Sequence, residues 1–253
     1  MTCTGQIDEV WAALERVTDP EIDESVTKLE FVTRVEIEAD SRVRIEFRLP
    51  TYWCAPNFAF LMASDMRDAV EELPWVKEVS VQLLDHFSAT LINRSVALKQ
   101  DFRDAFPGET DGDLREIRRS FLGKSYQRRQ ELLMRHALRC GIEASWLVRT
   151  TLAELKELPL DEEGGSLRNL YVFAWRRIHI GSNEEQLAFT TVDRRPLSLG
   201  ELKDYLRLIA GVRRTADFNG LICRGLLAAR NGNIPGRREN ALNQGLGDAV
   251  PCL

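Results

Sequence analysis

Hydrophobic and polar residues alternate along two short stretches, which predicts a β-hairpin. Residues 31–37 (FVTRVEI) and 43–49 (VRIEFRL) both follow a period of two, typical of strands with one buried face. Ala39-Asp40-Ser41 supplies a short connection between them. Residues 75–83 (WVKEVSVQL) predict a third strand further along the chain. The pattern therefore indicates a small sheet near the N-terminus.

Helical spacing of apolar residues on either side of the hairpin completes a compact unit. Apolar residues recur every three or four positions over residues 6–17, and Asp19-Pro20 ends this helix because the residue before a proline avoids the helical region. Pro56 suits the first turn of a second helix, running to about Leu73. The order α-turn-β-β-α-β predicts an α+β sandwich over residues 1–98.

The remainder of the chain is predicted to be mainly helical. A polar linker over residues 99–113 precedes a long helix, Leu114 to Leu138, which Gly141 ends. Residues 170–175 (LYVFAW) fit either a buried helix or a strand. Further helices are expected over residues 143–158, 199–212 and 216–229. The predicted domains are residues 1–98 and 114–230, followed by a mobile tail over residues 231–253.

Charge divides the chain in the same place. Residues 1–98 hold 9 Lys/Arg and 18 Asp/Glu, whereas the stretch Leu114–Arg139 holds eight basic residues and two acidic ones. A basic helix of this kind is either a solvated face or a surface for an acidic partner or nucleic acid. We expect it to face an external partner and the two halves to fold independently.

Composition narrows the class of protein. The chain has 253 residues, 44% of them hydrophobic and 29% charged, as in a soluble globular protein, and no apolar run is long enough for a membrane span. The first six residues lack the features of a signal peptide. The five cysteines are scattered, with no Cys-x-x-Cys pair, which argues against a disulfide framework or a closed zinc site. A cytoplasmic protein that does not contact the membrane is expected.

Two short turns carry the candidate chemistry. The first presents two carboxylates, Asp19 and Glu21, around a proline, and the second presents Thr51 and Cys54 between a strand and a helix. We expect the helix macrodipole to favour the thiolate of Cys54, which is a good ligand for iron. The alternative is that Cys54 is a small buried hydrophobe and Asp19 a turn former. If the two turns meet at one end of the sheet, they form a transient metal site.

These residues resemble a known family. Val17-Thr18-Asp19-Pro20-Glu21-Ile22, a hairpin and a Thr-x-x-Cys-x-Pro turn are similar to the PaaD-like iron–sulfur cluster assembly family (domain of unknown function 59), over roughly residues 6–84. The family usually has glycine at the position of Glu30 and proline directly after its cysteine, where Ala55 intervenes here. Longer proteins of this kind resemble those encoded beside bacterial binuclear-iron monooxygenases.

The resemblance implies a cytosolic maturation factor rather than an enzyme. Asp19, Glu21, Thr51 and Cys54 match the family's motif and would bind a transient iron or iron–sulfur cluster, with Cys54 as the metal ligand. Since one thiolate cannot hold a cluster, a client iron enzyme, a small thiol or a second copy in a homodimer would complete the ligands.

Two other functions compete with this one. The basic Leu114–Arg139 helix could bind nucleic acid, although the overall acidity of the chain and the absence of a recognition motif argue against it. A thiol enzyme could use Cys54 with His86 as its base, but no third group that would orient the base can be named. His86, His136 and His179 are otherwise interpreted as structural residues.

Overall fold

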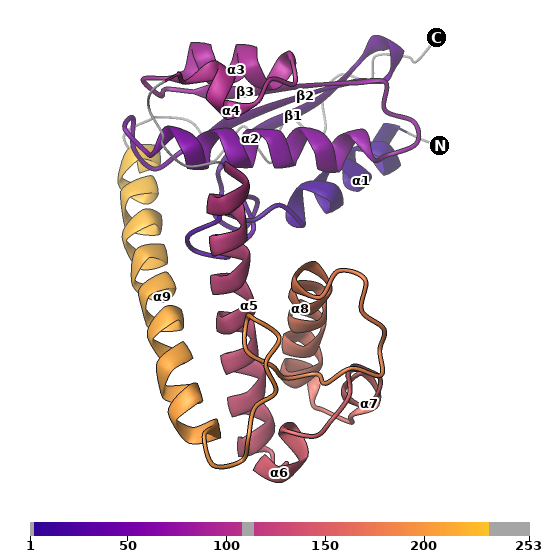
Figure 1. Cartoon of the computed structure of the whole chain (residues 1–253). Helices are drawn as coiled ribbons and strands as arrows, with labels where there is room; N and C mark the ends of the chain where they lie inside the picture. Colours follow the sequence, from indigo (N-terminus) through magenta and orange to yellow (C-terminus); the bar gives the residue numbers. More distant parts are fainter. Residues whose placement is uncertain (1–2, 108–113, 233–253) are drawn as a thin grey trace. The chain divides into compact units, whose positions relative to one another are not determined.

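The computed structural model describes residues 3–107 and 114–232, which form two compact units (Figure 1). Within these residues, the first unit holds 3–15, 26–98 and 220–232, and the second holds 16–25, 99–107 and 114–219. Independent folding of residues 1–98 stays a prediction. Of the predicted mobile tail, residues 231 and 232 end a helix, and residues 233–253 lie outside the described part of the chain.

The first unit confirms the predicted α+β fold. Its three-stranded sheet has the order β1-β2-β3, with β1 antiparallel to β2 and β2 parallel to β3. Arg48 at the end of β2 pairs with Leu84 at the end of β3, so the loops that follow these two strands leave the same edge of the sheet. The elements are α1 (Cys3–Glu15), β1 (Val32–Glu38), η1 (Ala39–Ser41), β2 (Arg42–Arg48), α2 (Pro56–Glu71), β3 (Glu78–Leu84) and α3 (Ala89–Ala97).

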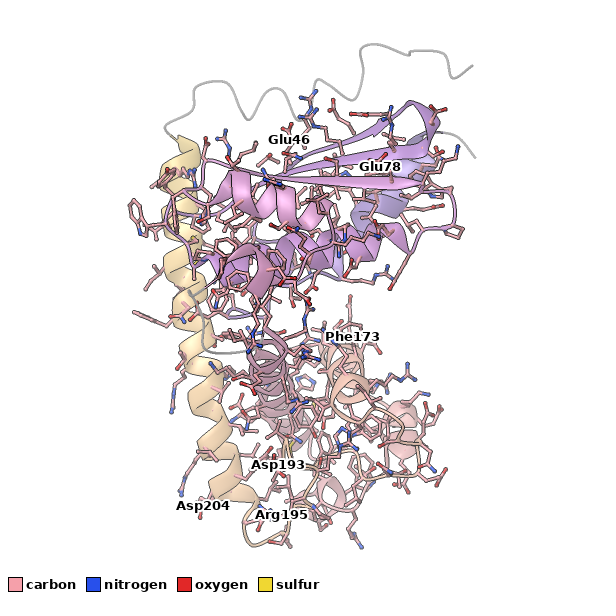
Figure 2. All side chains as sticks on the ribbon, turned by 45° about the horizontal axis from the view of Figure 1, so that its top comes forward. Glu46, Glu78, Phe173, Asp193, Arg195 and Asp204 are labelled. Carbon is pink, nitrogen blue, oxygen red and sulfur yellow. The ribbon has the colours of Figure 1, made fainter. Side chains whose placement is uncertain are left out.

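The sheet has one apolar and one polar face, as the alternating sequence requires. Val43, Ile45 and Phe47 of β2 are buried, while Glu46 of β2 and Glu78 of β3 belong to the polar side chains of the sheet (Figure 2). Helices α2 and α3 pack against β3, and α1 packs against α2 and β1. These contacts bury the apolar faces that the sequence pattern predicted for the strands and the helices.

Several turns of this unit use the left-handed backbone region. Asp40 and Ser41 in the hairpin have φ values of 62° and 61°. Glu30, just before β1, has a φ of 56° and donates its backbone N–H to the carbonyl of Thr27 at 3.0 Å. Glycine adopts this conformation at lower cost than a residue with a Cβ. The positive φ of Glu30 therefore explains why glycine would suit this position.

The second unit is mainly helical. Its core lies where α5 and α8 pack together, with Tyr126, Tyr171 and Trp175 among the fully buried side chains. Residues 170–175 are therefore helical, which decides between the two predicted alternatives. The helices are α4 (Phe102–Ala105), α5 (Leu114–Arg139), α6 (Ala144–Leu147), α7 (Leu152–Glu157), α8 (Glu162–Ile178) and residues 202–219 of α9 (Leu202–Gly232).

Between residues 99 and 232, the described structure differs from the predicted elements in three places. The predicted linker contains α4, whose Phe102 is buried. The helix predicted over residues 143–158 is divided into α6 and α7, because Thr151 begins α7 in a capping box with Glu154. The helices predicted over 199–212 and 216–229 are one helix, α9, in which the Thr215 hydroxyl donates to the carbonyl of Gly211 at 3.1 Å.

Among residues 3–107 and 114–232, no helix combines the length and the apolar character needed to cross a bilayer.

Candidate functional site

Cys54 lies in the loop between β2 and α2, as the sequence predicted. Its Sγ is 3.1 Å from the Thr51 hydroxyl, and the thiol is partly buried. Ala55 is the N-cap of α2 and Pro56 occupies the first turn, so Cys54 stands one residue before the positive end of the helix dipole. The Thr51 hydroxyl is placed to donate a hydrogen bond to a thiolate at this position.

His86 holds the same loop from the end of β3. The His86 side chain is buried, and its Nε2 lies 2.8 Å from the carbonyl oxygen of Cys54. The backbone N–H of Ser88 donates to Nδ1 at 3.1 Å, so Nδ1 is the acceptor and Nε2–H donates to Cys54. Burial, with a smaller effect of the Arg230 charge, lowers the pKa of His86 from its ordinary value of 6.5. A neutral His86 therefore positions the loop through its backbone.

This geometry does not support the thiol-enzyme alternative. Nε2–H donates to the main-chain carbonyl of Cys54 rather than to its Sγ, and Nδ1, the nitrogen that could serve as a base, accepts the backbone N–H of Ser88. A general base must reach the proton that it abstracts. His86 is thus a positioning residue, and it was correctly interpreted as structural from the sequence.

Arg230 of α9 also braces this region and was missed by the sequence analysis. Its guanidinium donates to the carbonyl of Leu49, which begins the cysteine loop, and to the carbonyl of Asp85 at 2.9 Å. Asp85 in turn forms an ion pair of 2.9 Å with Arg48 at the end of β2. One arginine, 145 residues from Asp85 in sequence, therefore ties the two loops together. Nothing in the local sequence signals this role, because it depends on the tertiary position of α9.

Three exposed aromatic side chains surround the cysteine loop. Tyr52 and Trp53 are 54% and 74% exposed, and Phe87, in the next loop, is 51% exposed. The ring centroids of Tyr52 and Phe87 are 6.3 Å apart, and the Phe87 backbone N–H donates to the Tyr52 carbonyl at 3.1 Å. Aromatic side chains left in water beside a partly exposed thiol are typical of a surface that binds a partner.

Asp19 and Glu21 lie in the second unit, and their predicted meeting with Cys54 stays a prediction. The Asp19 carboxylate accepts the backbone N–H groups of Glu21 and Ile22, both at 2.9 Å, and so closes its own turn. Burial raises the pKa of Asp19 from 3.8 to about 6, against these two hydrogen bonds. Asp19 is therefore both a turn former and a carboxyl group whose pKa is raised by burial.

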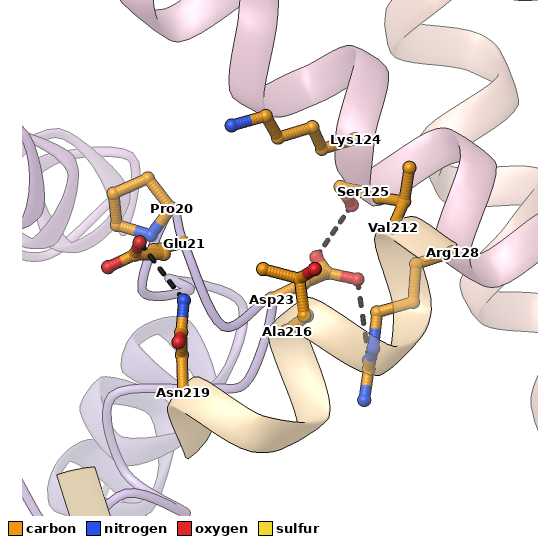
Figure 3. Close-up of a pocket in the computed structure, with 10 residues that line it drawn as sticks. Pro20, Glu21, Asp23, Lys124, Ser125, Arg128, Val212, Ala216 and Asn219 are labelled. Atoms are coloured by element: carbon orange, nitrogen blue, oxygen red, sulfur yellow. Dashed lines mark hydrogen bonds and ion pairs between the residues drawn. The ribbon is translucent and has the colours of Figure 1, made fainter. Parts of the chain in front are cut away.

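Glu21 and Asp23 line a pocket of about 320 Å³ within the second unit (Figure 3). The amide of Asn219 donates to Glu21 at 3.1 Å. Asp23, which the sequence analysis missed, accepts hydrogen bonds from the Ser125 hydroxyl at 2.6 Å and from Arg129 at 2.8 and 2.7 Å. The acidic turn is thus held by side chains of α5 and α9.

The Asp23 contacts change the interpretation of the basic helix. The Arg129 side chain is 8% exposed and forms a two-point ion pair with Asp23, and a nitrogen of Arg128 lies 3.7 Å from the same carboxylate. Arg128 and Arg129 of α5 therefore bind an acidic group of the same chain that lies outside this helix. The expectation that this helix faces only an external partner is wrong for these two residues.

A comparison with known families decides what the cysteine loop belongs to. Residues 7–82 match the family model of the iron–sulfur cluster assembly proteins. This part of the chain belongs to that family. The match covers Asp19, Glu21, Thr51 and Cys54 of this iron–sulfur cluster assembly domain, and it ends before His86. No curated protein matches the chain.

Proposed function

We propose that the protein matures the iron site of a client enzyme, with the Cys54 thiolate as the ligand that carries iron or an iron–sulfur cluster. The observation that carries this proposal is the construction of the cysteine loop, in which Thr51 contacts the sulfur while His86 and Arg230 fix the backbone. A held loop with a partly accessible thiol lets iron bind and leave. Membership of residues 7–82 in an assembly family supports iron as the cargo.

The remaining ligands of the metal would come from outside the loop. A cluster normally takes four protein ligands, and this loop offers one thiolate. The exposed rings of Tyr52, Trp53 and Phe87 give a client or a second copy of the chain a surface on which to dock beside the sulfur. Asp19 and Glu21 are proposed to assist at the site, and the protein is proposed to act in the cytoplasm without catalysing a reaction of its own. We propose a binuclear-iron monooxygenase as the client.

The test compares Cys54→Ser with Cys223→Ser, a second partly exposed thiol of the first unit. Each full-length variant is loaded anaerobically with Fe²⁺ and sulfide and then mixed with the apo client. We expect Cys54→Ser to lose client activation while keeping the melting temperature of the Cys223→Ser protein. Full client activation by Cys54→Ser would overturn the proposal, and loss of folding would instead indicate that Cys54 is a structural core residue.

Trp53→Ala separates docking from metal binding. Because Trp53 is 74% exposed, its removal should change the free energy of unfolding by less than about 0.5 kcal/mol. We expect iron binding to be retained and the affinity for the client to fall. Unchanged client affinity would show that the aromatic surface serves another purpose.

A further inference from the structure

A histidine, a cysteine and an aspartate converge in the second unit, far in sequence from the cysteine loop. Nε2 of His136, Sγ of Cys140 and a carboxylate oxygen of Asp161 all lie within 4.8 Å of one another. His136 lies in the last turn of α5, and Cys140 directly follows the last residue of that helix, Arg139. The backbone N–H of Cys140 donates to the carbonyl of His136 at 3.0 Å, which continues the helical turn and keeps the two side chains close. Asp161 comes from the N-cap of α8. We propose that these three side chains bind one divalent transition-metal ion, Zn²⁺ or Fe²⁺.

The distances are close to those of a metal-bound set. With metal–sulfur and metal–nitrogen bonds of about 2.3 and 2.0 Å, tetrahedral geometry places S and N about 3.5 Å apart and N and O about 3.3 Å apart. The observed separations are 3.4 Å between Cys140 Sγ and His136 Nε2, and 2.7 Å between His136 Nε2 and Asp161 Oδ1. Binding thus requires the N–H···O contact to open by roughly half an ångström.

The histidine is held rigidly while its two partners are open to solvent. The His136 side chain is 4% exposed and that of Asp161 is 57% exposed, and Cys140 is also exposed. A Cβ at Gly164 would lie 2.9 Å from Cδ2 and Nε2 of His136, so only a glycine allows α8 to pack this closely on the ring. The imidazole is therefore preorganised, and a metal can reach it past exposed ligands.

The surroundings also suit a metal-bound imidazole. Glu163 Oε2 lies 3.6 Å from His136 Nδ1, so by moving closer it can accept a hydrogen bond from Nδ1–H once Nε2 binds the metal. Nη2 of Arg139 lies 3.4 Å from the same Nδ1 and would have to give way to Glu163. The backbone N–H of Gly164 donates to Asp161 Oδ1 at 2.7 Å and so orients the carboxylate.

The chemistry of the three donors selects the ion. An imidazole, a thiolate and a carboxylate suit the borderline ions Zn²⁺ and Fe²⁺ better than Mg²⁺ or Ca²⁺, which prefer oxygen ligands alone. Three protein ligands leave a fourth position for water or for another molecule, as in open rather than closed zinc sites. The site would hold its metal exchangeably, and it involves none of the residues proposed to carry iron at the cysteine loop.

The experiment uses Co²⁺ as a spectroscopic probe in full-length protein carrying Cys54→Ser, which removes the thiol of the proposed iron carrier. We expect a thiolate-to-cobalt charge-transfer band that is competed away by Zn²⁺ and, under anaerobic conditions, by Fe²⁺ if the site also takes iron. Adding Cys140→Ser should abolish the band, and adding Cys223→Ser as the matched thiol control should keep it. A band that survives Cys140→Ser, or no band in the Cys54→Ser protein, would overturn the proposal.

Two further variants exclude a merely structural role. Asp161→Asn keeps the N-cap of α8, because asparagine caps as well as aspartate, and it should lower the Zn²⁺ affinity at least about tenfold. Glu163→Gln should lower the Zn²⁺ affinity by about tenfold without removing the cobalt band. Equal affinities in both variants and the parent would show that the cluster only caps α8. Success or failure here leaves the Cys54 proposal untouched, since all variants already lack that thiol.

Discussion

The raised pKa of the buried Asp19 carboxyl predicts how the free energy of unfolding depends on pH, and this dependence can be measured. Asp19 is 7% exposed, and burial raises its pKa from 3.8 to about 6. Between these two values the folded state binds more protons than the unfolded state, so this group makes the protein less stable as the pH rises. A shift of about two pKa units corresponds to about 3 kcal/mol in the free energy of unfolding. Asp19→Asn removes this dependence and keeps an oxygen to accept the two N–H groups.

The assay measures urea unfolding of the full-length wild type and of Asp19→Asn at several pH values. Relative to the variant, the wild type should gain about 2–3 kcal/mol as the pH falls from 7.5 to 4. Taking the difference is necessary because the lowered pKa of His86 acts in the opposite direction, reducing stability as the pH falls below about 6.5. A carbon-13 titration of the carboxyl groups, with the variant for assignment, should show one midpoint close to 6.

A difference between wild type and variant that stays constant with pH would refute this reasoning. So would a wild type that gains stability relative to the variant as the pH rises, since that is the behaviour of a carboxylate stabilised in its charged form.

Two other substitutions test single contacts. Arg129→Met leaves the Asp23 carboxylate buried without its two-point partner and should lower the free energy of unfolding by about 3–5 kcal/mol. Arg119→Met, at an exposed position of α5, should change the free energy of unfolding by less than about 0.5 kcal/mol. Equal effects of the two substitutions in urea titrations would contradict the buried ion pair. Glu30→Gly should increase the free energy of unfolding by up to about 1 kcal/mol and raise the melting temperature, because Glu30 has a φ of 56°. Glu30→Ala should give no such increase, and the same result for both variants would contradict the strain argument.

The sequence predicted the first unit well because its elements depend on local patterns. The period-two alternation of β1 and β2 and the proline at the start of α2 act within a few residues. The division between α6 and α7 also had a local signal, Thr151-x-x-Glu154, which was overlooked. The break expected between residues 212 and 216 is absent from α9, where Arg213 forms ion pairs with Glu131 and Asp217 and the helix continues.

The residues of the candidate sites also differ in whether a local sequence pattern could reveal them. Thr51 and Cys54 were found because they are neighbours in sequence, and their contact is present. Arg230 could not be predicted, because its partners lie more than a hundred residues away. The spacing His136-x-x-x-Cys140 at the end of the predicted helix Leu114–Leu138 was a visible signal for a metal-binding pair, but the third member, Asp161, is the N-cap of a different helix.

The hairpin between β1 and β2 has a practical consequence. It precedes β2, whereas the Cys54 loop follows β2, so the two lie at opposite ends of that strand. Its left-handed residues, Asp40 and Ser41, already tolerate an unusual backbone, and Asp40 is exposed. A fluorophore or affinity handle grafted at this turn would report on the assembly domain, or immobilise it, while the thiol and its aromatic surroundings stay open to a client.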